Sequence, residues 1–289
     1  MSPLRNKMIQ DMQLRRFSPH TQEAYVRAVA GLAQFYHQSP DQLNPEQVRA
    51  YLLHLMVKRQ LSWSSCNVVA SGLQFFYSVT LAQKGVHLEI PPRKTPHILP
   101  EILSAQELER LFLAPKNLKQ RTLLMTTYAA GLRVSEVVHL KIHDVDSQRM
   151  LIRVEQGKGR KDRYTILSPR LLRELRQYWK QYRPPLWLFS QKGSAARPLS
   201  TSGAQHTYYT AKKKAKIVKG RGIHCLRHCF ATHLLEAGVD VRKIQALMGH
   251  TSIRTTMLYL QVTQKQLMAV QSPLDLLALP ENPQGTERP

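Results

Sequence analysis

Apolar residues recur at three- and four-residue spacing along the first part of the chain, which is the pattern of amphipathic helices. One such run starts at Pro19, a typical first-turn proline, and another starts at Asn44-Pro45. A further run starts at Ser62 and continues to Tyr77. We therefore predict that the N-terminal part is a small bundle of about four helices.

A proline-rich stretch follows this bundle. Four prolines and two basic residues lie within residues 91–100, and this composition excludes a helix interior. We interpret it as an extended linker between two domains. The chain is then expected to hold a helical domain over residues 1–88, a linker over 89–100, a second domain over 101–279 and a disordered tail over 280–289.

The second domain mixes helical and β-type patterns. Ser104 and Glu107 have the spacing of a capping box, and Gly131 is expected to end a later helix. Short β-rich runs at 150–154 and 163–167 predict a β-hairpin. Helical patterns return at 171–178 and, apart from a short apolar run at 186–189, continue to about residue 277. The predicted fold class is mainly α with a small β-sheet.

Charge narrows the class of function. The chain of 289 residues has 42 Lys and Arg against 19 Asp and Glu, a net charge of +23. Such an excess favours a polyanionic partner, with nucleic acid as the first candidate. The densest basic segment, residues 212–221, suits contact with backbone phosphates. No apolar run reaches the length of a membrane span, and the three cysteines lack disulfide-framework spacing. A membrane protein and a secreted disulfide scaffold are excluded.

Two segments present basic side chains next to glycines. Arg133 follows Gly131 closely and precedes Glu136 by three residues, so a carboxylate could orient a buried guanidinium. The alternative is an exposed ion pair, which this segment alone favours. Lys158 lies between Gly157 and Gly159 at the expected hairpin tip, where a solvated basic turn is an equally good interpretation.

A further segment gathers histidines and cysteines. On a helix, His224, Arg227 and His228 share one face. Cys225 and Cys229 raise the alternative of a zinc site, but no partner pair with the usual ligand spacing occurs elsewhere. We expect these cysteines to be small buried residues of a core helix.

Two more candidates lie near the C-terminus. His250 follows Gly249, and Tyr259 comes nine residues later. A single histidine is more often a hydrogen-bonded polar residue than a catalytic one, and a single tyrosine at helical spacing is more often part of a core or an interface. Residues 241–260 also have the look of a helix–turn–helix with Gly249 at the turn.

The six candidates together form a set suited to phosphoryl transfer. Arginines can clamp the oxygens of a phosphodiester, and a tyrosine can attack its phosphorus to form a covalent intermediate. A lysine can protonate the leaving oxygen, and histidines can handle the tyrosine proton. This chemistry requires no metal. The set is Arg133, Lys158, His224, Arg227, His250 and Tyr259.

These segments resemble the tyrosine recombinase (phage integrase) family, and the resemblance covers nearly the whole chain. It is carried by Ala130-Gly131-Leu132-Arg133-Val134-Ser135-Glu136, by Gly157-Lys158-Gly159, by His224-Cys225-Leu226-Arg227-His228, and by Met248-Gly249-His250 with Thr255-Thr256 and Tyr259. The resemblance implies that Lys158 is the general acid and Tyr259 the nucleophile. It implies phosphate binding or proton handling for Arg133, His224, Arg227 and His250.

The resemblance also implies the wider organisation. The N-terminal domain would be a helical, SAM-like core-binding domain that closes over DNA, and the C-terminal domain an α+β catalytic domain. The expected partners are double-stranded DNA, a homo-tetramer on two DNA sites and, optionally, an accessory recombinase, with no cofactor and no metal. The segment after Tyr259 would be donated to a neighbouring subunit or pack on its own domain. We expect the protein to be located in the cytoplasm and to be associated with the bacterial nucleoid.

Residues 12–25 are similar to integron integrases and to relatives carried by insertion elements, although the integron-type insertion between Lys158 and His224 is absent. The expected reaction integrates, excises or transposes mobile DNA. Two alternatives stay open. A DNA-binding regulator would use residues 241–260 to read DNA, and a type IB topoisomerase would relax DNA by the same chemistry without a special site.

Overall fold

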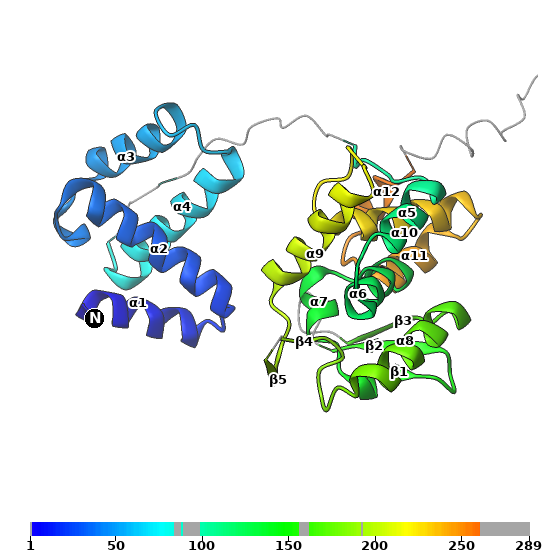
Figure 1. The fold of residues 1–289 in the computed structure, drawn as a ribbon. Coiled ribbons are helices and arrows are strands. Elements are labelled where there is room, and N and C mark those ends of the chain that lie inside the picture. The colour runs from blue at the N-terminus through cyan, green and yellow to red at the C-terminus, as the bar shows by residue number, and fades with distance from the viewer. Residues whose placement is uncertain (1, 84–87, 89–98, 156–161, 192, 261–289) are drawn as a thin grey trace, which may run out of the picture. The chain divides into compact units, whose positions relative to one another are not determined.

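The computed structural model describes residues 2–83, 88, 99–155, 162–191 and 193–260. The chain divides into two compact units, Met1–His97 and Ile98–Pro289, and Figure 1 shows the helices and strands of each. Most of the predicted linker, the tip of the predicted hairpin with Lys158, and the predicted tail lie outside the described residues. Within the described ranges, no helix is both long enough and apolar enough to cross a membrane.

The first unit is a helical bundle, as the apolar spacing predicts. Its α-helices are α1 (Pro3–Leu14), α2 (Pro19–Tyr36), α3 (Pro45–Val57) and α4 (Trp63–Phe75), with a 3₁₀ turn at Pro40–Gln42 and a π-helical turn at Phe76–Thr80. The side chains of Ser18, Asn44 and Ser62 each accept a backbone N–H at the start of a helix. Local capping thus fixes the three helix starts that the sequence predicts, and these predictions are confirmed.

A glycine allows the two central helices of this bundle to approach closely. A Cβ atom at Gly72 of α4 would lie 3.1 Å from both the Cβ of Ala28 and the Cα of Tyr25 on α2. The side chains that fill the surrounding core include Met8, Met12, Leu32, Leu73 and Phe76, each no more than 1% exposed. The bundle therefore has a core of its own.

The second unit is also mainly helical. Its α-helices are α5 (Ala105–Leu113), α6 (Leu118–Ala129), α7 (Val134–Val138), α8 (Pro169–Tyr182), α9 (Thr201–Lys214), α10 (His224–Glu236), α11 (Val241–Met248) and α12 (Ile253–Met257), with a 3₁₀ turn at Ile142–Asp144. The capping box of Ser104 and Glu107 begins α5, and Gly131, with a φ of 60°, follows the end of α6. Both predictions are confirmed.

The main sheet has three antiparallel strands in the order β1-β2-β3: β1 (Val145–Asp146), β2 (Leu151–Val154) and β3 (Arg163–Ile166). In the predicted hairpin, Val154 pairs with Arg163 and Leu151 pairs with Ile166. The pairing of these two strands is confirmed. The fold class is therefore mainly α with a small sheet, as predicted.

One prediction of continuous helix is wrong. After the apolar run at 186–189, the chain forms a second antiparallel pair, β4 (Ser190–Gln191) and β5 (Ser194–Pro198). Gly193, with a φ of 80°, lies in the turn between them. These strands are too short to show a clear alternation of apolar and polar residues, so periodicity could not reveal them. The predicted helical stretch beyond residue 260 lies outside the described residues.

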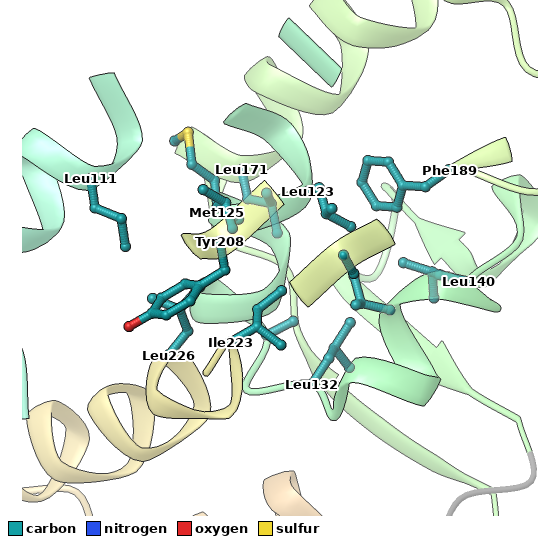
Figure 2. Packing of buried hydrophobic residues seen from close by; sticks show 14 of the residues in the cluster. Leu111, Leu123, Met125, Leu132, Leu140, Leu171, Phe189, Tyr208, Ile223 and Leu226 are labelled. Atoms are coloured by element: carbon teal, nitrogen blue, oxygen red, sulfur yellow. The ribbon is translucent and has the colours of Figure 1, made fainter. Parts of the chain in front are cut away.

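One face of helix α9 packs into the core of the second unit. Tyr208 on this helix is fully buried, and Figure 2 shows it among side chains that include Leu226 and Ile223. Its hydroxyl donates a hydrogen bond of 3.0 Å to the carbonyl oxygen of Gly220, just before α10. This contact ties the start of α10 to the core and so helps to fix the helix that carries His224 and Arg227.

The two cysteines of α10 are buried and free, as expected for core residues. The Cys229 sulfur accepts the backbone N–H of Leu103 at 3.2 Å, and the Cys225 thiol donates to the carbonyl oxygen of Glu101 at 3.3 Å. Both thiols therefore hold α10 against the segment that leads into α5.

Candidate active site

Arg227 is the central basic residue of the site. It projects from the first turn of α10 and is 1% exposed. Its Nη1 donates to the carbonyl oxygen of Gly131 at 2.6 Å, and its Nη2 donates to the carbonyl oxygen of Met248 at 2.5 Å. Burial and the neighbouring charge of Arg133 lower the pKa of Arg227 to about 10, so the guanidinium stays charged at neutral pH. Arg227 thus joins the turn after α6 to the end of α11.

Glu136 gathers three arginines around one carboxylate. Arg133 Nη1 lies 2.7 Å from Glu136 Oε1, and Arg163 donates to both carboxylate oxygens at 2.8 Å. Arg227 Nη1 lies 3.6 Å from Oε2. The side chain of Glu136 is only 6% exposed. We call Arg133, Arg163 and Arg227 the arginine cluster; with Glu136 included, its net charge is +2.

The carboxylate is held ionised by these partners. Burial alone would raise the pKa of Glu136, but the hydrogen bond and charge of Arg163, followed by the backbone and side-chain hydrogen bonds of Arg133, bring it to about 2. Arg133 is therefore not an exposed surface ion pair, since its side chain is 21% exposed and is directed by a buried carboxylate. Such a fixed guanidinium is suited to binding a phosphate oxygen.

Arg163 is a site residue that sequence reasoning missed. It begins β3, and its Nε donates to the carbonyl oxygen of Leu247 at 2.9 Å. Gly249 ends α11 with a φ of 62°, and a Cβ there would lie 2.6 Å from the Cδ of Arg163. The only sequence signal was its place in a basic run beside a glycine-rich turn. Arg163 binds the hairpin to the segment that precedes His250.

Tyr259 lies just after α12 and is 3% exposed. Its hydroxyl oxygen is 3.0 Å from the Nδ1 of His228 on α10. The ring of His250 lies nearly parallel to the tyrosine ring, with 6.5 Å between centroids and 13° between planes. Burial raises the pKa of Tyr259 to about 12, although Arg227 and Arg133 act in the opposite direction. The hydroxyl is therefore protonated at neutral pH.

Three histidines line the same cavity as this tyrosine, and the pKa values of two of them are strongly lowered. Burial, followed by the nearby His224 and Arg227, lowers the pKa of His228 to about 4. Burial and the arginine cluster lower the pKa of His250 to about 4 as well. Both imidazoles are therefore neutral at neutral pH, when each has one nitrogen that can accept a hydrogen bond. His224 is more exposed, and its ring meets the ring of His228 edge-on at 4.7 Å.

A cavity of about 500 Å³ opens beside the tyrosine. Its charged and titratable lining consists of Glu101, Arg221, His224, Cys225, His228, His250 and Tyr259. Together with the neighbouring arginine cluster, this lining offers positive charge, neutral imidazoles and a hydroxyl, a combination suited to an anionic substrate that a tyrosine attacks.

The structure brings five of the six predicted site residues together in the second unit. Arg133 and Arg227 meet around Glu136. His224 contacts His228, and both His228 and His250 contact Tyr259. Lys158 lies outside the described residues. Residues 241–260 form two helices with Gly249 at the turn, which is the helix–turn–helix pattern that the sequence suggested. Met248 and Tyr259 in this segment are buried.

Comparison with known proteins identifies the family of the chain. Residues 101–266 match the phage integrase family, and residues 4–85 match the phage integrase N-terminal SAM-like domain. The chain is 44% identical over 281 residues to a putative integrase/recombinase, y4qK, of Sinorhizobium fredii, covering 97% of this chain and 91% of the relative. It is 34% identical to the tyrosine recombinase XerA of Thermococcus kodakarensis, covering 94% of this chain and 96% of the relative.

The fold agrees as well. A crystal structure of a lambda integrase dimer bound to a core site superposes with a TM-score of 0.69 at 17% identity, covering 88% of this chain and 93% of that chain. This likeness shows a shared fold. The two family matches and the identities to recombinases show that the chain belongs to the phage integrase family of tyrosine recombinases.

Proposed function

We propose that this site-specific DNA recombinase cuts and rejoins double-stranded DNA through a covalent 3′-phosphotyrosyl intermediate on Tyr259. The Tyr259 oxygen attacks the scissile phosphorus, and the bond from phosphorus to the 5′ oxygen breaks. One observation carries the proposal: two adjacent residues of α10 link the arginine cluster to the nucleophilic tyrosine. Arg227 belongs to the arginine cluster, and His228 contacts the tyrosine hydroxyl. A phosphate held by the cluster is thereby brought to the nucleophile.

The arginines would stabilise the charge that develops during attack. Arg133 and Arg227 are assigned to the non-bridging oxygens of the phosphate. The net charge of +2 on the cluster with Glu136 supports this role, because fixed positive charge in a buried site favours a pentacoordinate transition state. His224 and His250 would donate N–H groups to the same phosphate, since both line the cavity beside Tyr259.

Lys158 is assigned to protonation of the leaving 5′ oxygen. The support is its place in the sequence, between two strands that do pair as a hairpin and beside glycines that allow a tight turn. Arg163 at the start of β3 is fixed to Glu136, so the described part of this hairpin is anchored to the arginine cluster.

The N-terminal unit would clamp the DNA. Support comes from its match to the SAM-like domain of phage integrases and from a net charge of +23 over the chain. We assign the clamp to residues 1–88, a linker to 89–100 and the catalytic domain to 101–279. A tetramer on two DNA sites, with residues after Tyr259 donated between subunits, would carry out strand exchange. The protein would act in the cytoplasm on nucleoid DNA and move mobile DNA by integration, excision or transposition.

Covalent capture tests this function. Wild-type protein and Tyr259→Phe are incubated with labelled fragments that flank the gene, including nicked suicide substrates, and analysed on a denaturing gel. A protease-sensitive shifted band with wild type alone supports the proposal. Tyr128→Phe is a matched control, because Tyr128 also bonds to a histidine of α10, His233, and should keep the band. Tight site-specific binding by wild type without any band would reject the proposal.

A further inference from the structure

The three histidines around Tyr259 differ in what they offer to its hydroxyl. The Nδ1 of His228 lies 3.0 Å from the hydroxyl oxygen, a full hydrogen-bond contact. The rings of the two residues are 5.7 Å apart and tilted by 51°. This geometry aims a nitrogen of His228 at the oxygen that would attack phosphorus.

His250 presents its face to the tyrosine. Its ring plane is within 13° of parallel to the tyrosine ring, and its Nδ1 is 2.9 Å from the hydroxyl oxygen of Thr256. The lone pair of an imidazole nitrogen lies in the ring plane, so a stacked ring is poorly oriented to accept a proton from its stacking partner. His250 is better suited to donate to a phosphate than to take the tyrosine proton.

His224 meets His228 rather than the tyrosine. Its ring contacts the His228 ring edge-on at 4.7 Å, with planes at 90°. His228 therefore makes a direct hydrogen-bond contact with the nucleophile, whereas His224 contacts His228 and the His250 ring lies parallel to the tyrosine ring.

The surroundings of His228 keep its accepting nitrogen available. On its own helix, His224 and Arg227 disfavour its protonation, and burial acts in the same direction. The other charged and titratable groups around the shared cavity are Glu101, Arg221, Cys225, His250 and Tyr259. A phosphodiester bound beside Arg227 would bring a negative charge. This charge would offset the positive charge of Arg227 and so raise the basicity of His228.

We infer that His228 is the general base for Tyr259, an inference that rests on the proposed function. As the Tyr259 oxygen forms its bond to phosphorus, its proton passes to the Nδ1 of His228, and the 5′ oxygen leaves with a proton from the general acid. In the rejoining step the 5′ hydroxyl attacks phosphorus and gives its proton to the deprotonated general acid. The bond from phosphorus to the tyrosine oxygen breaks, and His228 returns the proton to that oxygen.

Helix α10 supplies a matched control for this pair. The Nδ1 of His233 lies 2.9 Å from the hydroxyl oxygen of Tyr128, nearly the same contact as that of His228 with Tyr259. Tyr128 does not line the cavity beside Tyr259. His233→Asn therefore reproduces the structural cost of replacing a tyrosine-bound histidine on this helix while leaving the proposed proton transfer intact.

The test measures single-turnover formation of the covalent complex on a nicked suicide substrate at saturating protein. His228→Asn is the main variant, since its amide oxygen can accept the tyrosine hydroxyl bond but cannot hold the proton. We expect its cleavage rate to fall by about 100-fold or more with DNA affinity unchanged, and His233→Asn to cleave at the wild-type rate. His228→Gln is a second neutral variant, for the case in which His228→Asn unfolds.

Two further readouts separate a base from a structural residue. Without a base the tyrosine must ionise first, so the rate of the His228 variants should rise about tenfold per pH unit above neutrality, whereas wild type should change little. A substrate with a 5′-thio leaving group, which needs no acid, should not restore the His228 variants. Restoration by this substrate would place His228 on the leaving-group side and overturn the inference.

The remaining outcomes are also decisive. Cleavage at the wild-type rate by His228→Asn, or by His228→Gln if His228→Asn unfolds, would overturn the role of His228. Absence of covalent complex with wild type and with His233→Asn alike would instead reject the proposed function, and so the two failures are distinguishable.

Discussion

Arg163 and Glu136 form a two-point ion pair in which Nη1 and Nη2 each lie 2.8 Å from a different carboxylate oxygen. The pair joins the start of β3 to α7, and Glu136 also holds Arg133 at 2.7 Å. A guanidinium matches a carboxylate at two points, which an ammonium group cannot do. Arg163 thus fixes the position of Arg133 through the carboxylate that they share.

Removing Arg163 should therefore damage both stability and cleavage. Arg163→Ala leaves Glu136 buried with fewer partners, and we expect a loss of about 3 kcal/mol in the free energy of unfolding, measured by urea denaturation. Arg163→Lys should recover only part of this. The control is Arg27→Ala, which breaks an exposed Arg–Glu pair and should cost less than about 1 kcal/mol. Equal losses for the two alanine variants would contradict the structural role of Arg163.

The acid sensitivity of the protein should depend on Glu136. Its pKa is about 2 in the folded protein, below the ordinary value of 4.5. The unfolded chain therefore binds the proton first, so the stabilisation by Glu136 is complete above the ordinary pKa and is lost as pH falls through the folded pKa. The shift corresponds to about 3 kcal/mol.

The test compares the stability of Glu136→Gln with that of wild type, measured by thermal unfolding at a series of pH values from neutral to acidic. This variant should be less stable than wild type near neutral pH, and the difference between the two should shrink toward the folded pKa of Glu136. A difference that stays constant over this range would show that ionisation of Glu136 does not stabilise the fold.

Gly249 should not tolerate a side chain. Its φ is 62°, and a new Cβ would meet the Arg163 side chain at 2.6 Å. We expect Gly249→Ala to cost about 2 kcal/mol, from backbone strain and displacement of Arg163, and to slow cleavage. Gly238→Ala is the matched control, because Gly238 also has a positive φ of 83° but has nothing within 4 Å of a new Cβ. The Gly238→Ala variant should show only the cost of backbone strain and should cleave normally. Slow cleavage by Gly238→Ala would contradict the explanation that displacement of Arg163 slows cleavage.

The basic segment at the end of α9 should contribute to the salt dependence of DNA binding. Lys213, Lys214 and Lys216 are exposed, whereas Lys212 donates to the carbonyl oxygen of Gly220 and Lys219 pairs with Glu107. Replacing the three exposed lysines by Gln should reduce the slope of log affinity against log salt by about 2 to 3, because fewer counterions are released.

The control for this experiment is Lys180→Gln, which removes one exposed charge from α8. Its slope should stay closer to that of wild type, within about one unit. A triple variant with the wild-type slope would show that this segment does not contact phosphates.

Sequence reasoning succeeded where structure is determined locally. Ser18, Asn44, Ser62 and Ser104 cap helices through backbone groups only three residues away, so their patterns are visible in the chain. The second strand pair could not be found because strands of two and five residues carry almost no periodic signal.

The candidate site shows the same contrast between features that a local motif reveals and contacts that form only when distant elements pack. Motifs pointed to Arg133, Arg227 and Tyr259, but not to the contact of His228 with Tyr259, which joins residues 31 positions apart. Arg163 reaches Glu136 over 27 positions and Leu247 over 84. Such contacts arise when α7, α10 and β3 pack together, and no spacing rule within one element predicts them.

Peptide mapping by mass spectrometry can show whether Tyr259 becomes covalently joined to DNA. Trypsin should cut after Arg254 and Lys265, releasing an eleven-residue peptide whose only tyrosine is Tyr259. After trapping on a suicide substrate and nuclease digestion, we expect a nucleotide 3′-phosphate on Tyr259 and a free 5′ hydroxyl on the released strand. An adduct on Thr255 or Thr256, or cut DNA without any adduct, would contradict this expectation.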